Sequence, residues 1–238
     1  MLKQVYVGAA RGVRSGLDRA GLIEPWDRWA ARSRAGHWSR SLLAVYDLDD
    51  LARLDVPWWT YDSVGKVERL LASRSAPRVL EWGSGSSTLW LAKRSAEVRS
   101  IEHDTDWAAQ LGPRLPSNVE LVCVPPAPAT GRPGEVRSHK KGFEGLDFAE
   151  YVAAAGQFDG AFDVVVVDGR AREACLPVAL DRLAPDGVVV LDNVDRARYR
   201  DAVTALGGAV EVDWTRGLTP TLPYPTRTAL VRKRPARR

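Results

Sequence analysis

The chain has 238 residues, of which 45% are apolar and 27% charged, a composition that excludes a chain disordered throughout. No run of about 18 apolar residues is present, which excludes a membrane-spanning helix. The net charge of +4 is uneven, because residues 1–45 carry +5, residues 232–238 carry +5, and the middle carries −6. An acidic centre disfavours nucleic acid as a partner, and any membrane contact would come from the basic ends, which are more simply read as solvated.

Two cysteines, Cys123 and Cys175, are too few for a disulfide scaffold. The first residues also contain no apolar segment of the kind that directs export. We therefore expect a cytoplasmic protein.

Residues 1–55 are predicted to form a basic, tryptophan-rich helical extension, since five of the nine tryptophans precede residue 60. Stretches 5–20 and 24–33 fit amphipathic helices with arginines on the outer face. Such a segment could pack on the following domain, form a dimer or lie on a membrane surface, and we favour packing. The sequence does not indicate an oligomeric state.

Residues 56–232 alternate short apolar runs with helical stretches, which is typical of βαβ units. The expected strands are 79–82, 98–102, 119–124, 163–168, 188–192, 210–214 and 228–231. The expected helices are 62–71, 88–94, 105–115, 148–155, 174–183 and 196–206.

The resulting prediction is an α/β fold: a doubly wound, Rossmann-like parallel sheet of about seven strands with helices on both faces, plus the N-terminal extension. Gly187 is expected to mark the turn into the fifth strand. Residues 125–146 are rich in Pro, Gly and Lys and are expected to form a long loop, and residues 233–238 form a basic tail.

The first expected strand leads into Gly83-Ser84-Gly85, and a helix is expected to follow at once. Glycines permit a sharp turn and close approach of a ligand, and Ser86, Ser87 and Thr88 can cap the helix or bind that ligand. Glu102 ends the second strand, where an acid can accept hydrogen bonds from both hydroxyls of a ribose. This order of features predicts a nucleoside-binding loop.

Two residues help to choose between nucleoside ligands. Thr88 stands where a dinucleotide site has a third glycine, and Glu81 would repel a pyrophosphate but suits a cationic ligand. An NAD-linked oxidoreductase is therefore an alternative of lower rank. A further alternative is a non-catalytic nucleoside-binding or membrane-associated module.

These features resemble the class I methyltransferases that use S-adenosylmethionine. The resemblance covers about residues 55–232, and a bacterial subgroup is suggested by stretches 57–61, 81–90, 101–104, 167–170 and 191–193. It implies that Glu81, Gly83 and Gly85 line the methionine end, that Glu102 binds the ribose, and that His103 and Asp104 flank the adenine. The full set of candidate cofactor-binding residues is Glu81, Gly83, Ser84, Gly85, Ser86, Ser87, Thr88, Glu102, His103 and Asp168. The chain departs from the family after the third strand, where residues 123–126 lack the acid that contacts the adenine amino group.

Asp168 and Arg170 follow the fourth strand, and Asp192 and Asn193 end the fifth, so these side chains are expected at one edge of the sheet. Asp168 is the candidate base for a hydroxyl acceptor, and Arg170 is expected to bind the acceptor, a small molecule or a glycan. The arrangement also resembles the metal site of catechol-type O-methyltransferases. That resemblance implies a possible Mg²⁺ held by Asp168, Asp192 and Asn193.

Overall fold

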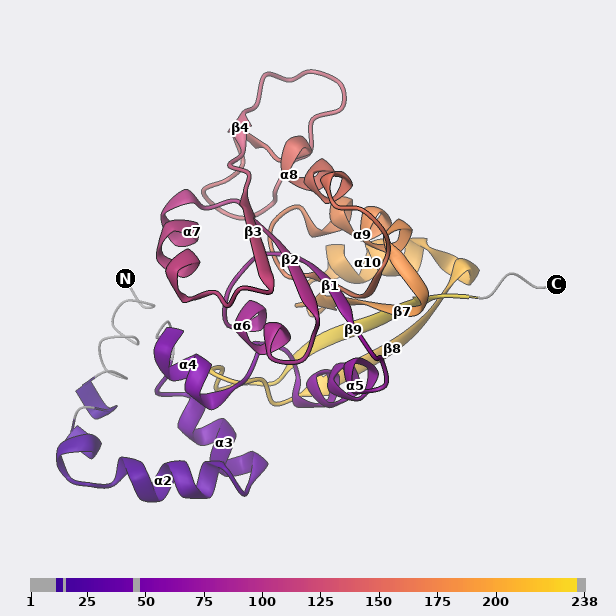
Figure 1. Cartoon of the computed structure of the whole chain (residues 1–238). Helices are drawn as coiled ribbons and strands as arrows, with labels where there is room; N and C mark the ends of the chain where they lie inside the picture. The colour runs from indigo at the N-terminus through magenta and orange to yellow at the C-terminus, as the bar shows by residue number, and fades with distance from the viewer. Residues whose placement is uncertain (1–11, 15, 45–47, 235–238) are drawn as a thin grey trace.

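The computed structural model describes residues 12–14, 16–44 and 48–234. Its centre is a seven-stranded sheet with helices on both faces (Figure 1), as predicted. The strands, in spatial order, are β3 (Val119–Cys123), β2 (Glu97–Glu102), β1 (Arg78–Trp82), β6 (Phe162–Val167), β7 (Leu183–Asp192), β9 (Thr226–Lys233) and β8 (Val210–Gly217). The helices of the domain are α5 (Tyr61–Ala72), α6 (Ser86–Ala92), α7 (Thr105–Leu111), α8 (Ala149–Ala153), α9 (Arg172–Asp181) and α10 (Ala197–Ala205).

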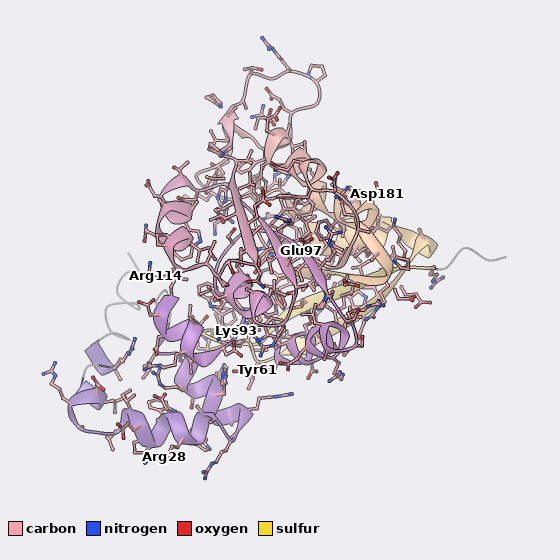
Figure 2. All side chains as sticks on the ribbon, in the orientation of Figure 1. Arg28, Tyr61, Lys93, Glu97, Arg114 and Asp181 are labelled. Carbon is pink, nitrogen blue, oxygen red and sulfur yellow. The ribbon has the colours of Figure 1, made fainter. Side chains whose placement is uncertain are left out.

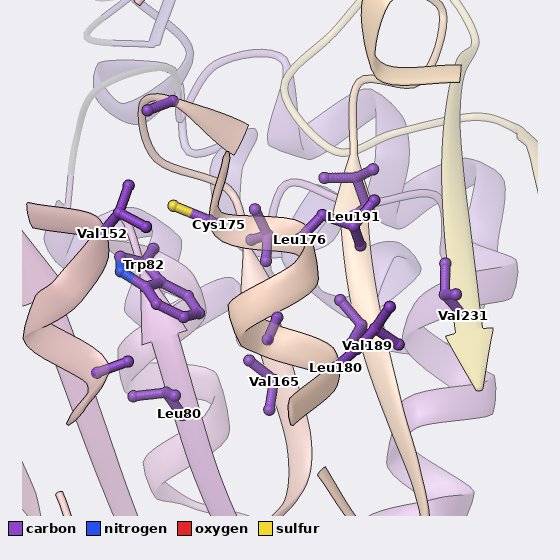
Figure 3. Close-up of a cluster of buried hydrophobic side chains, with 14 of the residues drawn as sticks. Leu80, Trp82, Val152, Val165, Cys175, Leu176, Leu180, Val189, Leu191 and Val231 are labelled. Atoms are coloured by element: carbon purple, nitrogen blue, oxygen red, sulfur yellow. The ribbon is translucent and has the colours of Figure 1, made fainter. Parts of the chain in front are cut away.

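The central strands are apolar on both faces, and each face packs on its own helices. On one face, Leu80 and Val165 join the buried side chains of α8, α9 and α10. Figure 3 shows this cluster, with Cys175 of α9 beside the sheet. On the other face, Val79 packs against α5 and α6. The two buried layers hold the carboxyl ends of β1, β2, β6 and β7 in fixed relative positions.

Chain order reverses beside β1, because β2 and β3 extend the sheet in one direction and β6 and β7 in the other. Ligands of such sheets bind outside the strand ends at this reversal. The predicted parallel sheet is parallel except at its last strand, since β9 lies antiparallel between β7 and β8. Residues 218–225, which join β8 to β9, are too few for a crossover, so the two strands form a hairpin.

The turn expected at Gly187 is also absent, because β7 runs unbroken from Leu183 to Asp192. The Pro185-Asp186-Gly187 segment instead forms an irregularity in the pairing of β7 with β6. Asp186 has a φ of 59° there. The loop predicted over 125–146 is present and carries the short pair β4 (Ala127–Pro128) and β5 (Leu146–Asp147) at its two ends.

The described part of the extension forms α2 (Ile23–Ala30), α3 (Arg34–Ser41) and α4 (Leu48–Leu54). Of the helix predicted over 5–20, residues 1–11 and 15 lie outside the described residues, as do 235–238 of the basic tail. Within the described residues, every helix falls short of the length and apolar character that a bilayer crossing demands.

The extension is attached to the domain by direct contacts. Trp38 Nε1 donates to the carbonyl of Leu222 at 2.9 Å, and Ser41 Oγ accepts from the backbone N–H of Thr221 at 2.9 Å. Arg114, labelled in Figure 2, pairs with Asp49 of α4 at 3.1 Å. These contacts agree with the packing that the sequence favours.

Candidate active site

A cavity of about 940 Å³ lies along the carboxyl ends of β1, β2, β6 and β7. Its walls come from the glycine loop after β1, the segments after β2, β6 and β7, helix α4, and the 218–225 loop with the start of β9. This volume is at the upper end of small-molecule sites, so the cavity has room for a nucleoside and a second small ligand.

The glycine loop makes a turn that requires glycine at its first position. Gly83 has a φ of 93°, and a Cβ there would lie 2.6 Å from the backbone of Gly169 in the loop after β6. Its N–H donates to the carbonyl of Ile101 at 2.8 Å. The backbone of Gly85 donates to Thr88 Oγ1 at 2.8 Å, which begins α6. The loops after β1 and β6 therefore meet at the floor of the cavity.

Glu81 lies behind this loop. Its side chain is fully buried and accepts hydrogen bonds from Ser87 Oγ, from Thr88 Oγ1 at 2.6 Å and from Ser100 Oγ at 2.9 Å. Burial raises the pKa of the Glu81 carboxyl to about 7, although the three hydroxyls oppose the shift. Neither Glu81 nor Thr88 is among the residues that line the cavity, so their contact with a ligand stays a prediction. The structure shows that the Glu81 carboxyl links the start of α6 to β2 through hydrogen bonds.

Glu102 faces the cavity at the end of β2. Its Oε2 accepts from Ser84 N at 2.9 Å, and its Oε1 accepts from His103 N at 2.7 Å and Asp104 N at 2.9 Å. His103 Nδ1 also lies 2.6 Å from Oε1. Oε2 accepts one hydrogen bond and can accept a second, so this oxygen stays open for a ligand. Trp107, which the sequence did not single out, lines the same wall and donates from Nε1 to the carbonyl of Ser84 at 2.8 Å.

His103 stands in an aromatic group beside Glu102. Its ring centroid lies 5.5 Å from that of Phe143 and 5.8 Å from that of Tyr151. The Arg170 guanidinium lies 4.9 Å from the Phe143 centroid, so Arg170 adjoins this group. Burial and the nearby Arg172 lower the pKa of Arg170. Phe143 belongs to the long loop, and Lys140 of the same loop lines the cavity.

Asp168 and Asp192 lie at the neighbouring ends of β6 and β7, as predicted, but a residue that the sequence did not single out joins them. The Arg172 side chain contacts Asp168 Oδ1 at 2.7 Å and donates to the carbonyl oxygens of Gly169, Asp192 and Asp168 at 3.1, 2.6 and 2.7 Å. Ala171, at a φ of 48°, makes the sharp corner before α9. Asp168 and Arg172 are four residues apart, a spacing that can form an ion pair. Predicting this pair from the sequence would also have required the position of the corner at Ala171.

Burial raises the pKa of both carboxyls at this edge. For Asp168 the charge of Arg172 opposes the shift. For Asp192 the charge of Asp168 adds to it, and the pKa reaches about 7. Asp192 Oδ1 accepts from Thr228 Oγ1 at 2.6 Å, and its Oδ2 accepts from the Asn193 amide nitrogen.

This donor set does not fit the Mg²⁺ that the resemblance to catechol-type enzymes makes possible. Asp168 is paired with a guanidinium, and Asn193 presents its nitrogen to Asp192. Mg²⁺ requires oxygen ligands in near-octahedral geometry. Within residues 12–14, 16–44 and 48–234, no group of three or more His, Cys, Asp or Glu side chains is arranged for a metal ion.

The remaining walls of the cavity are largely apolar. Trp58 lines it, whereas Trp59 is fully buried against Trp90 with ring centroids 6.0 Å apart. Leu51 of α4 and Tyr224 of the 218–225 loop also face it. Prolines restrict the backbone of that loop, which borders one side of the cavity. The Tyr224 side chain is 57% exposed at the rim of the cavity.

Comparison with known proteins agrees with this geometry. Residues 80–194 match the family model described as a methyltransferase domain. No curated protein matches the sequence. A putative O-methyltransferase from Klebsiella pneumoniae is 18% identical, with a TM-score of 0.55 over 82% of this chain and 90% of that one. The O-methyltransferase TomG from Streptomyces achromogenes, solved with S-adenosylmethionine, is 21% identical, with a TM-score of 0.53 over 84% and 90%.

The fold is therefore that of the Rossmann-like methyltransferases. The methyltransferase domain matched by residues 80–194 agrees with this fold.

Proposed function

We propose that the protein is an S-adenosylmethionine-dependent methyltransferase that acts on a hydroxyl of a small-molecule or glycan acceptor. The observation that carries the proposal is Glu102, which is held by three backbone N–H groups and faces the same cavity as the glycine loop and Asp168. The family match over residues 80–194 supports it.

The residues around the cavity suit the parts of this cofactor. Glu102 has the free acceptor site that a ribose needs, and Ser84 and Gly85 offer backbone beside it. His103 provides an aromatic surface for a purine, and Arg170 contacts the Phe143 ring that His103 also contacts. When bound, S-adenosylmethionine supplies a methyl group on a positively charged sulfur.

Asp168 is the base in this proposal. Its carboxylate faces the cavity next to Gly169, where the loops after β1 and β6 meet. Burial shifts its pKa toward the physiological range, which favours proton transfer from a hydroxyl. Trp58 and Leu51 exclude water and offer an apolar wall for the acceptor. Arg170, which lies beside the aromatic group, is in this proposal a residue of the nucleoside end rather than of the acceptor end.

Calorimetric titration tests the proposal. S-adenosylhomocysteine is expected to bind and NAD is not. The Glu102→Gln variant should bind S-adenosylhomocysteine about 5- to 150-fold more weakly, because an amide nitrogen would face a backbone or ribose donor at a cost of about 1–3 kcal/mol.

Glu97→Gln is the matched control, because Glu97 lies at the opposite end of β2 and pairs with Arg78. It should leave the affinity unchanged. Binding of NAD in place of S-adenosylhomocysteine, or equal affinities in Glu102→Gln and the wild type, would contradict the proposal.

A further inference from the structure

We infer that Arg172 occupies the place of a divalent cation at the Asp168–Asp192 edge, so that methyl transfer by this protein uses no metal ion. This inference rests on the proposed function. It concerns a residue to which neither the family match nor the fold assigns a role.

The guanidinium of Arg172 joins the two strand ends as a bound cation would. It contacts one carboxylate oxygen of Asp168 and the main-chain oxygens of residues 168, 169 and 192, all within 3.1 Å. The side chain is 5% exposed, and its Nε and both terminal nitrogens are engaged. A guanidinium keeps its charge at all physiological pH values, so this positive charge is permanent.

The surrounding groups leave little for a metal to bind. One oxygen of Asp192 accepts from Thr228, and the other accepts from the Asn193 amide. Asp168 would have to give up Arg172 before it could enter an octahedral shell. A divalent cation would also meet the charges of Arg172 and Arg170, which both line the cavity.

The chemistry can proceed without a metal. The acceptor hydroxyl gives its proton to the Asp168 carboxylate, and its oxygen bonds to the methyl carbon as the carbon–sulfur bond breaks with its electron pair on sulfur. The proton then leaves Asp168 for solvent, so no other reactant is needed. Arg172 is a positioning residue in this step, because it orients the base and does not touch the acceptor.

Manganese, which is paramagnetic and accepts the oxygen ligands of Mg²⁺, is the probe. Binding is followed by electron paramagnetic resonance at millimolar Mn²⁺, with and without S-adenosylhomocysteine. Wild-type protein is expected to bind no Mn²⁺ at this edge. Arg172→Met should bind Mn²⁺ at least about tenfold more tightly than the detection limit of this measurement, because two buried carboxyls lose their neutralising charge.

Arg198→Met is the matched control. Arg198 contacts the same Tyr199 ring as Arg172 but pairs with Glu173 outside the cavity, so its loss should create no Mn²⁺ site. A wild-type Mn²⁺ signal that Asp168→Asn abolishes would overturn the inference. So would a folded Arg172→Met that binds Mn²⁺ no better than the wild type.

A second measurement needs no variant. After chelation, the melting temperature of wild-type protein should not change on addition of Mg²⁺, whereas a bound ion would raise it. A rise that Asp168→Asn removes would also overturn the inference. Failure of the proposed function would appear separately, as absence of S-adenosylhomocysteine binding.

Discussion

Glu81 should make the stability of this protein depend on pH. Its pKa of about 7 in the folded chain compares with 4.5 for an ordinary glutamate. Between these values the folded state binds the proton that the unfolded chain has released, so the free energy of unfolding falls as pH rises. The stabilisation is complete below pH 4.5 and is lost as pH rises through 7.

The magnitude follows from the shift. Each pKa unit is worth about 1.4 kcal/mol, so the full effect is about 3 kcal/mol, and about 2–3 kcal/mol of it falls between pH 5 and pH 8.5. The Glu81 side chain is fully buried, so no discount for solvent screening applies.

Urea unfolding of the wild type and Glu81→Gln at pH 5 and pH 8.5 measures this effect. The glutamine amide is neutral at both pH values, and Ser87, Thr88 and Ser100 can each rotate a hydroxyl to accept from it. The wild type should lose about 2–3 kcal/mol more than the variant over this range. Other titrating groups, including Asp192, are present in both proteins and cancel in the difference.

Glu97→Gln serves as the control and should keep the wild-type pH dependence, since Glu97 is paired with Arg78 near the surface. The reasoning is refuted if wild type and Glu81→Gln lose the same free energy between the two pH values. That result would mean that Glu81 is ionised in the folded protein at neutral pH.

Three further outcomes are expected. Asp168→Asn should lower kcat at least about 100-fold, measured by release of S-adenosylhomocysteine. It should not weaken binding of S-adenosylhomocysteine. Weaker binding would mean that Asp168 contacts the cofactor instead. Trp107→Phe loses its hydrogen bond to the glycine loop and should weaken S-adenosylhomocysteine binding, measured by calorimetry, about 2- to 10-fold. An unchanged affinity would show that this hydrogen bond does not support cofactor binding. Gly83→Ala should lower the free energy of unfolding by at least about 2 kcal/mol, because its Cβ would meet the backbone of Gly169. Gly85→Ala, in extended backbone with nothing within 4 Å, should cost less, and equal losses would be evidence against this explanation.

The strands and the cavity wall were predictable because they depend on local patterns. Runs such as Asp163–Asp168 are apolar on both faces, which is the pattern of a central parallel strand. Parallel strands end at one edge, so Gly83, Glu102 and Asp168 were expected to meet, and all three line one cavity.

The rest depends on contacts between distant residues. β9 is antiparallel because it forms a hairpin with β8. Polar and apolar residues do not alternate regularly along β9, so the sequence contains no clear sign of this orientation. Glu81 resembles a ligand residue in the sequence, yet the hydroxyls of Thr88 and Ser100 engage it from α6 and β2. Arg172 reaches Asp168 only because Ala171 adopts a left-handed backbone conformation, which alanine rarely does and no pattern indicates.

The hairpin of β8 and β9 also bears on how the protein is made. Leu222, Tyr224, Pro225 and Thr226 complete a cavity whose other walls belong to residues between 48 and 196, and Leu222 also accepts a hydrogen bond from Trp38. A growing polypeptide therefore cannot assemble the whole cavity until translation has passed these positions and they have left the ribosome. A nascent chain stalled before residue 218 would present the glycine loop and Glu102 with one wall missing, and ligand capture by stalled chains should begin only after residues 218–226 emerge.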